Sequence, residues 1–349
     1  MNINDIYMRR CLQLAENGRG YVSPNPMVGA VIVCNGKIIG EGFHREYGKP
    51  HAEVNAINSI KDKSQLSDSV IYVSLEPCSH YGKTPPCAQL IIDSGIPEVV
   101  IAMSDPFPHV SGRGIKMLKE AGVKVTVGVL EKEAKILNRA FISAQVRQRP
   151  YVYLKWAQTK DGFIDKIRKR DEIPQATPIS NHFTRMLVHK LRAEISSIMI
   201  GTNTAIKDNP SLTTRFWYGK NPTRIVLDRQ NRIPDDYHIL DNKVKTLVFT
   251  ECTDTEIKKG DTQYIPINFD NNLLPNLLSE LDRRKIDSVM VEGGNMLLQS
   301  FIDANLWDEA FIEIADITFG DGVPAPRAEG KIISQKAFEG SQQIHLLKE

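Results

Sequence analysis

The chain has 349 residues, which is enough for two domains with separate hydrophobic cores. Hydrophobic residues make up 41% and charged residues 25% of it, as in ordinary globular proteins. The formal net charge of +2 is too small to indicate a nucleic acid or a membrane surface as partner. No apolar run approaches bilayer length and the N-terminal residues hold no apolar signal core, so we expect a cytoplasmic protein.

The five cysteines are an odd number, which argues against a disulfide framework. Cys11, Cys34 and Cys252 are interpreted as structural or incidental, because a free cysteine usually behaves as a small hydrophobic residue. Cys78 and Cys87 differ because other candidate metal ligands accompany them.

The first half of the chain alternates helices and strands. An amphipathic helix is predicted over residues 5–17, followed by β-rich runs at 28–34 and 37–43 that the hairpin signal Asn35-Gly36 joins. The next predicted elements are a helix from 51, a strand at 70–74, a helix at 87–94, a strand at 98–102, a helix ending near 122 and a strand at 123–127. This order predicts an α/β layered domain with a mostly parallel half-sheet.

A charged helical connector over residues 131–148 separates the two halves, and we place the domains at 1–147 and 148–349. The second half is predicted to alternate again, with strands at 151–158, 197–201, 223–227, 245–249, 288–292 and 311–314 and helices at 181–195, at 273–284 and from 294. The basic run Lys166–Arg170 is interpreted as a solvated loop, with phosphate contact as the alternative.

His51, Glu53, Cys78 and Cys87 form the most informative motif. Two thiolates and an imidazole supply three ligands for Zn²⁺ and leave a fourth position for water, which the metal activates as hydroxide at neutral pH. Glu53 is placed to carry protons between that water and a departing amino group. The combination is typical of zinc-dependent nucleobase deaminases, although the two cysteines lie nine residues apart and not in a C-x-x-C motif. A closed structural zinc site is the alternative.

Longer motifs point to one family. They are Ser23-Pro24-Asn25-Pro26, His51-Ala52-Glu53, Glu76-Pro77-Cys78, Lys155-Trp156-Ala157, Gly201-Thr202-Asn203-Thr204, Asp208-Asn209-Pro210 and Val291-Glu292-Gly293-Gly294. On these motifs the first half resembles the cytidine/deoxycytidylate deaminase superfamily and, within it, the pyrimidine deaminase of the bifunctional RibD family of riboflavin biosynthesis. The second half resembles the reductase of that family. The resemblance implies a cytidine-deaminase-like three-layer domain followed by a dihydrofolate-reductase-like α/β domain.

The resemblance also implies two reactions and two cofactors. Zinc-dependent hydrolytic deamination of a diaminohydroxy-phosphoribosylaminopyrimidine would be followed by NADPH-dependent reduction of its ribosyl group to ribityl. In the deaminase, Asn25 and His44 would contact the pyrimidine, Lys83 and Thr84 the ribose-phosphate end, and Asp105 is a further candidate for substrate contact.

In the reductase, the resemblance places Ala157, Thr204, Asp208, Gly293, Gly294 and Asn295 at the cofactor. It places Arg192, Leu212, Arg215 and Glu292 at the substrate, with the arginines on its phosphate. A Gly-Gly turn before a helix lets a diphosphate approach backbone N–H groups, and a plain tight turn is the alternative.

Two segments depart from the family pattern. The loop at Asp105-Pro106-Phe107-Pro108 lacks the family's Asp-Pro-Asn-Pro, and Thr177-Pro178-Ile179-Ser180 stands where the family has a tryptophan. An inactive reductase domain is therefore one alternative. The others are a nucleic-acid base deaminase and a non-catalytic zinc scaffold. As partners we expect a small phosphorylated pyrimidine, no nucleic acid, no membrane, and further copies of this chain in a homo-oligomer.

Overall fold

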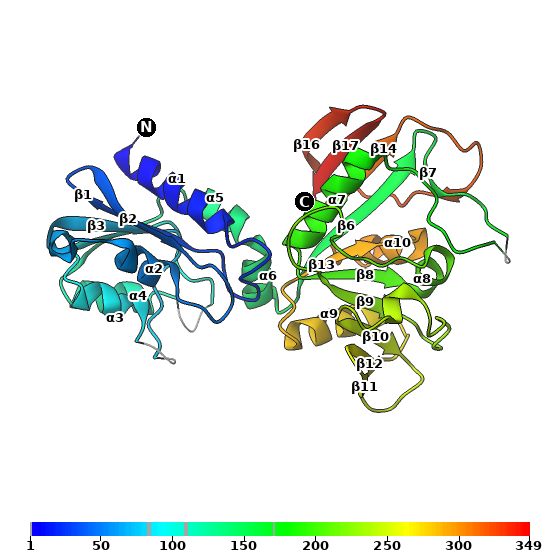
Figure 1. The fold of residues 1–349 in the computed structure, drawn as a ribbon, viewed down its shortest axis with the longest axis horizontal. Helices are drawn as coiled ribbons and strands as arrows, with labels where there is room; N and C mark the ends of the chain where they lie inside the picture. The colour runs from blue at the N-terminus through cyan, green and yellow to red at the C-terminus, as the bar shows by residue number, and fades with distance from the viewer. Residues whose placement is uncertain (1, 82–84, 108–110, 170–171) are drawn as a thin grey trace. The chain divides into compact units, whose positions relative to one another are not determined.

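The computed structural model describes residues 2–81, 85–107, 111–169 and 172–349. The chain divides into two compact units, Met1–Gln148 and Arg149–Glu349, and each is described by itself (Figure 1). In the described ranges, no helix has the length and apolar character needed to cross a membrane.

The first unit is a five-stranded sheet covered by helices on both faces. Its strands are β1 (Gly29–Cys34), β2 (Lys37–Phe43), β3 (Ser69–Val73), β4 (Glu98–Ile101) and β5 (Lys124–Val127), in the order β2-β1-β3-β4-β5. Its helices are α1 (Ile3–Glu16), α2 (Ala52–Ser59), the short 3₁₀ helix η1 (Lys63–Asp68), α3 (Cys87–Asp93), α4 (Arg113–Glu120), α5 (Glu131–Leu137) and α6 (Arg139–Arg147).

Strand pairing follows the predicted pattern in this unit. β1 pairs antiparallel with β2 and β3, and β3, β4 and β5 pair in parallel. Apolar side chains of α2, α3 and α4 pack on one face of the sheet, and those of α1 and α5 pack on the other. The three layers confirm the predicted α/β architecture of the first half.

Close contact between α2 and β2 depends on Gly42. A Cβ atom there would overlap with the backbone of α2 at Ala52 and Ala56, so only glycine lets the helix lie this near the strand. Since His51 and Glu53 stand at the start of α2, this contact fixes the depth at which both side chains enter the unit.

The second unit is built on a ten-stranded sheet with a small two-stranded sheet beside it. Its helices are α7 (His182–Glu194), α8 (Thr202–Asp208), the 3₁₀ helix η2 (His238–Leu240), α9 (Leu273–Arg283) and α10 (Asn295–Asp303). Its strands are β6 (Tyr151–Thr159), β7 (Phe163–Asp165), β8 (Ser197–Gly201), β9 (Thr223–Leu227), β10 (Thr246–Thr250), β11 (Ile257–Lys259), β12 (Thr262–Pro266), β13 (Ser288–Glu292), β14 (Glu309–Ala315), β15 (Val323–Pro324), β16 (Lys331–Phe338) and β17 (Ser341–Leu347).

The large sheet has the order β11-β12-β10-β9-β8-β13-β6-β14-β17-β16. The run from β12 to β14 is parallel, and β17 and β16 close it as an antiparallel hairpin. Buried side chains of β6, β13, α9 and α10 form the main core. The predicted alternation is confirmed, but α8, the C-terminal hairpin and the short strands β7, β11, β12 and β15 were not predicted.

Candidate functional site

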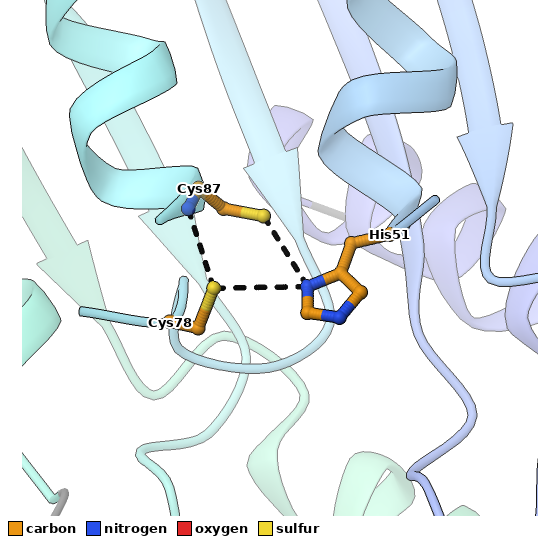
Figure 2. A group of neighbouring side chains, drawn as sticks. All are labelled: His51, Cys78 and Cys87. Atoms are coloured by element: carbon orange, nitrogen blue, oxygen red, sulfur yellow. Dashed lines mark hydrogen bonds between the residues drawn. The ribbon is translucent and has the colours of Figure 1, made fainter. Parts of the chain in front are cut away.

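Three candidate metal ligands converge in the first unit. His51 is the N-cap residue of α2, Cys87 is the first residue of α3, and Cys78 lies on the loop between β3 and α3. His51 Nδ1 lies 3.7 Å from Cys78 Sγ and 3.4 Å from Cys87 Sγ (Figure 2). All three donor atoms lie within 4.8 Å of one another.

This geometry fits Zn²⁺. Bonds of about 2.3 Å to sulfur and about 2.0 Å to nitrogen at tetrahedral angles require S···N separations of about 3.5 Å, close to both observed values. The Cys87 backbone N–H donates to Cys78 Sγ at 3.2 Å, and with the side chains of Cys87 and His51 it holds the pKa of the Cys78 thiol well below its usual value. The group that the described residues form contains three donors, so a fourth position remains for another ligand.

Glu53 lies beside the three candidate ligands in the first turn of α2 and is only 3% exposed. Burial, followed by the negative charge of Cys78, raises the pKa of Glu53 to about 7. A carboxyl group with such a pKa exchanges a proton readily near neutral pH, which is the property required of a general acid and base.

Asn25 and His44, expected at the pyrimidine, contact each other. Asn25 Nδ2 lies 3.0 Å from His44 Nε2, and His44 Nδ1 lies 3.1 Å from the carbonyl oxygen of Pro50. Burial lowers the pKa of His44, so the ring is neutral at neutral pH. Because the Pro50 carbonyl oxygen can only accept a hydrogen bond, Nδ1 of the neutral ring carries the proton. Nε2 is then unprotonated and accepts a hydrogen bond from the Asn25 amide NH₂ group. His44 also packs edge-on against His51, at 5.5 Å between ring centroids.

Asp105 follows β4 and lies within electrostatic reach of Cys78 and His80. Burial raises its pKa, and the nearby Glu76 carboxylate adds to this. Lys83 and Thr84, expected at the ribose-phosphate end, lie outside the described residues.

In the second unit, a charged cluster connects α7 to the end of β13. Arg192 Nη2 lies 2.8 Å from Glu292 Oε2, and Arg192 Nη1 donates to the Thr213 carbonyl oxygen at 3.3 Å. Lys155 on β6 stands in register with Glu292. Burial disfavours the charged form of Glu292, but Arg192 and Lys155 outweigh it and hold its pKa below the usual value. Arg192 Nε and Glu292 Oε1 are buried and have no hydrogen-bond partner among the described residues, so both can serve a ligand.

The turn between β13 and α10 has the form of a phosphate-binding turn. Gly293 has φ +130°, a backbone conformation that other residues rarely adopt, and Gly294 N–H donates to Thr204 Oγ1 at 2.9 Å. Gly294 caps α10 without a side-chain hydrogen bond, and Asn295 Oδ1 is buried with no partner among the described residues. Open backbone N–H donors at the start of α10 fit the diphosphate of NADPH, whereas Asn295 Oδ1 is an acceptor and suits a hydroxyl or N–H group of a ligand.

Arg215 and Leu212 lie on the loop that follows α8. Leu212 is buried with φ +51°, and Arg215 lies within electrostatic reach of Arg192 and His189. Burial and then the charges of these two arginines lower the pKa of His189 to about 4, so its ring is neutral. Its Nδ1 accepts a hydrogen bond from Phe216 N–H at 3.4 Å.

The solvated-loop interpretation of the basic run is wrong for Arg168. Its side chain is 10% exposed, and its guanidinium forms ion pairs of 2.9 Å with Asp165 and 2.8 Å with Asp208. The sequence pattern could not reveal this because Asp208 lies on a different element, α8. Arg170 lies outside the described residues. Asp208, expected at the cofactor, is the last residue of α8, the helix that also carries Thr204, and Ala157 lies on β6.

The segment that lacks the family's tryptophan makes polar contacts instead. Thr177 Oγ1 donates to Asp165 Oδ1, and Ser180 Oγ donates to Glu313 Oε2 at 2.6 Å. Both contacts tie the segment to strands of this unit, β7 and β14.

Comparisons with known proteins cover both units. The family described as the cytidine and deoxycytidylate deaminase zinc-binding region matches residues 1–103, and the RibD C-terminal domain family matches residues 150–345. The riboflavin biosynthesis protein RibD of Aquifex aeolicus is 40% identical over 92% of this chain and 89% of its own length. The RibD protein of Escherichia coli is 35% identical over 91% of this chain and 89% of its own length.

Solved structures agree with these relatives. A diaminohydroxyphosphoribosylaminopyrimidine deaminase/5-amino-6-(5-phosphoribosylamino)uracil reductase from Thermotoga maritima has a TM-score of 0.89 at 35% identity, covering 99% of both chains. RibD of Acinetobacter baumannii has a TM-score of 0.87 at 30% identity, covering 99% of this chain and 98% of that one.

Proposed function

This chain belongs to the RibD family of riboflavin biosynthesis proteins and is a bifunctional deaminase and reductase that uses zinc and NADPH, and we propose how its residues divide that work. Its substrate is a small molecule. We infer that this is the diaminohydroxy-phosphoribosylaminopyrimidine and, after deamination, the phosphoribosylaminouracil, because the similar Thermotoga maritima protein is described with both activities.

We propose that His51, Cys78 and Cys87 hold the zinc ion of the deaminase. The observation that supports this assignment is the convergence of one imidazole and two thiol groups at distances suited to tetrahedral coordination. When bound, Zn²⁺ supplies Lewis acidity that makes water a nucleophile at neutral pH.

Glu53 moves the protons of the deamination. The reaction exchanges the ring amino group for oxygen: water and the ring N=C–NH₂ group become HN–C=O and ammonia. Glu53 takes protons from the attacking water and passes one to the ring nitrogen and one to the departing amino group, for which a buried carboxyl group beside the three candidate ligands is suitably placed. The Asn25–His44 pair holds the pyrimidine beside it, because neutral His44 fixes the orientation of the Asn25 amide.

In the reductase, the turn at Gly293-Gly294 binds the cofactor diphosphate, and NADPH supplies the hydride. That hydride would reduce the anomeric carbon of the ring-opened imine, with a proton from solvent going to the imine nitrogen to give the ribityl-amine. Arg192 and Arg215 bind the substrate phosphate, Leu212 packs beside the substrate, and Glu292 beside Lys155 accepts a hydrogen bond from a sugar hydroxyl. Ala157, Thr204, Asp208 and Asn295 remain proposed cofactor contacts.

The alternatives lose their support once the second half is a reductase domain. A nucleic-acid base deaminase would need a binding module there, and a scaffold would not need Glu53 buried beside three converging metal donors. The protein acts in the cytoplasm in this proposal, which suits the five free thiols. It assembles as a homo-oligomer, for which the exposed Ile332 and Ile333 on edge strand β16 offer a surface, and light scattering in solution tests this.

Zinc removal tests whether the metal serves the deaminase reaction and not the reductase reaction. After chelation, ammonia release from the diamino substrate is expected to stop and to return with added Zn²⁺, while NADPH oxidation on the deaminated substrate continues. Loss of both activities together, or of neither, contradicts the assignment.

A further inference from the structure

Glu76 is a buried carboxylate that accepts four backbone hydrogen bonds from one distant segment. Its Oε2 accepts from the N–H groups of Asp105 at 3.1 Å and Gly112 at 3.0 Å, and its Oε1 accepts from those of Gly114 at 2.9 Å and Ile115 at 3.3 Å. The side chain is 5% exposed. One carboxylate therefore binds backbone N–H groups at the β4 end and at the α4 end of the segment that connects these two elements.

Two of these donors belong to the first turn of α4. That helix begins at Arg113, and its N-cap, Gly112, offers no side chain to satisfy the free N–H groups of the first turn. Glu76 supplies the missing acceptor from another part of the chain, where the positive end of the helix dipole also favours a carboxylate. The contact is tight, because a Cβ atom at Gly114 would overlap with the carbonyl oxygen of Pro77.

Cys78 has hydrogen bonds of its own that hold it in position. Its Sγ accepts from Cys87 N–H at 3.2 Å, and its carbonyl oxygen accepts from Ala88 N–H at 3.1 Å, so the start of α3 holds it. The backbone N–H of Asp105, in contrast, donates to the Glu76 carboxylate. Asp105 Oδ1 accepts from the N–H of Phe107 within the same loop. The Glu76 N–H also donates to the Met103 carbonyl oxygen at 2.9 Å, and this backbone bond is independent of the side chain. The Glu76 carboxylate adds the side-chain contact that ties Asp105 itself to the metal-binding segment.

We propose that Glu76 is a positioning residue of the deaminase: its carboxylate holds the Asp105 loop at a fixed place beside the candidate metal ligands, so that Asp105 meets the pyrimidine substrate. The inference rests on the proposed function, in which Asp105 contacts that substrate. Glu76 itself contacts neither substrate nor metal in this proposal. Its effect on deamination is exerted entirely through the position of Asp105.

The first test is Glu76→Gln, which keeps the shape of the side chain but replaces one accepting oxygen with an NH₂ group that faces N–H donors. We expect kcat/KM for deamination to fall about 10- to 100-fold, mainly through KM, as is usual for residues that orient the groups acting directly. Bound zinc, measured by elemental analysis, and NADPH oxidation on the deaminated substrate should equal those of the parent. Glu120→Gln, an exposed change on the same α4, is the matched control.

The conservative variant and a double-mutant cycle separate positioning from a general structural role. Glu76→Asp keeps both accepting oxygens and should recover part of the lost kcat/KM; a variant no better than Glu76→Gln contradicts the inference. In the Asp105→Ala background, Glu76→Gln should change kcat/KM by less than about twofold, because the residue it positions is gone. Full additivity of the two changes, or loss of zinc from Glu76→Gln, overturns the inference.

The single variants also distinguish the substrate contact of Asp105 from the positioning role of Glu76. If Asp105→Ala alone deaminates like the parent, the proposed substrate contact of Asp105 is wrong and the role of Glu76 falls with it. If Asp105→Ala is impaired while Glu76→Gln is not, the substrate contact stands and only the positioning role is overturned.

Discussion

Gly294 and Thr204 are joined by a hydrogen bond from the Gly294 N–H to Thr204 Oγ1, 2.9 Å long, although ninety residues separate them. The contact connects the turn after β13 with α8, which follows β8. β8 and β13 are neighbouring parallel strands, so their carboxyl ends open at one edge of the sheet. Ligands of open α/β sheets bind at such an edge, and here it carries the proposed NADPH site.

Gly293→Ala should weaken NADPH binding. The residue has φ +130°, and its Cβ would lie 3.0 Å from Thr204 Oγ1, so alanine must shift the turn that receives the diphosphate. Strain of about 1–2 kcal/mol corresponds to roughly a tenfold rise in Kd, measured by calorimetric titration. Gly320→Ala is the control, because Gly320 also has positive φ but lies in open space. Equal affinity in both variants would count against the cofactor assignment.

Glu53→Gln should retain zinc and lose deamination. The amide keeps the size of the buried side chain but carries no transferable proton, so kcat for ammonia release should fall about 10²- to 10⁴-fold. Zinc content should match the parent because none of the three donors changes. Glu133→Gln, an exposed change on α5, is the control. Turnover equal to the parent would refute the proton-carrying role.

Arg215→Ala should weaken binding of the reductase substrate and leave the deaminase intact. Loss of one charge-assisted hydrogen bond to a phosphate is worth about 1.5–3 kcal/mol, or roughly a 10- to 100-fold rise in KM for the deaminated substrate. Arg229→Ala removes an arginine of the same unit that pairs with Glu251 at the surface, and it should have no such effect. Unchanged KM in Arg215→Ala would remove the residue from the site.

His189 should make the second unit less stable in acid. Its pKa is about 4 in the folded chain and about 6.5 when unfolded, so the unfolded state binds the proton first. The free energy of unfolding is therefore unaffected by the titration of His189 above pH 6.5. It decreases as the pH falls toward 4, by up to about 3 kcal/mol, because protonation then favours the unfolded state. Fluorescence of Trp156, Trp217 and Trp307 reports on this unit, because the chain's three tryptophans all belong to it.

The control for this pH dependence is the exposed His238. His189→Asn should flatten the decline in denaturant midpoint between pH 6.5 and 4, whereas His238→Asn should keep it. A parallel decline in His189→Asn and the parent would show that other groups govern the acid sensitivity.

The three candidate metal donors could be recognised from the sequence because each belongs to a short local motif, two of them at the start of a helix and Cys78 on the loop before α3. His51 and Glu53 lie on one turn of α2, and Cys87 opens α3. The order of helices and strands followed from periodicity in the same way. What local patterns could not give is which distant side chains meet once the sheet forms.

Arg168 and Glu76 show this limit. The Arg168 guanidinium is buried between Asp165 and Asp208, and the second of these lies far along the chain on α8. Glu76 belongs to the recognised motif Glu76-Pro77-Cys78, but its carboxylate accepts hydrogen bonds from backbone N–H groups of another loop, and backbone groups leave no signal in a sequence. Lys155 becomes notable only through its register with Glu292.

In the proposed function, one chain deaminates first and reduces second, at two separate sites. The most direct measurement follows NADPH absorbance and product mass for the zinc-loaded parent and for Glu53→Gln, each with the diamino and with the deaminated substrate. The parent should oxidise NADPH with both, and release ammonia before NADPH oxidation when given the first. Glu53→Gln should oxidise NADPH only with the deaminated substrate. NADPH oxidation by Glu53→Gln on the diamino substrate at the parent rate would contradict the account.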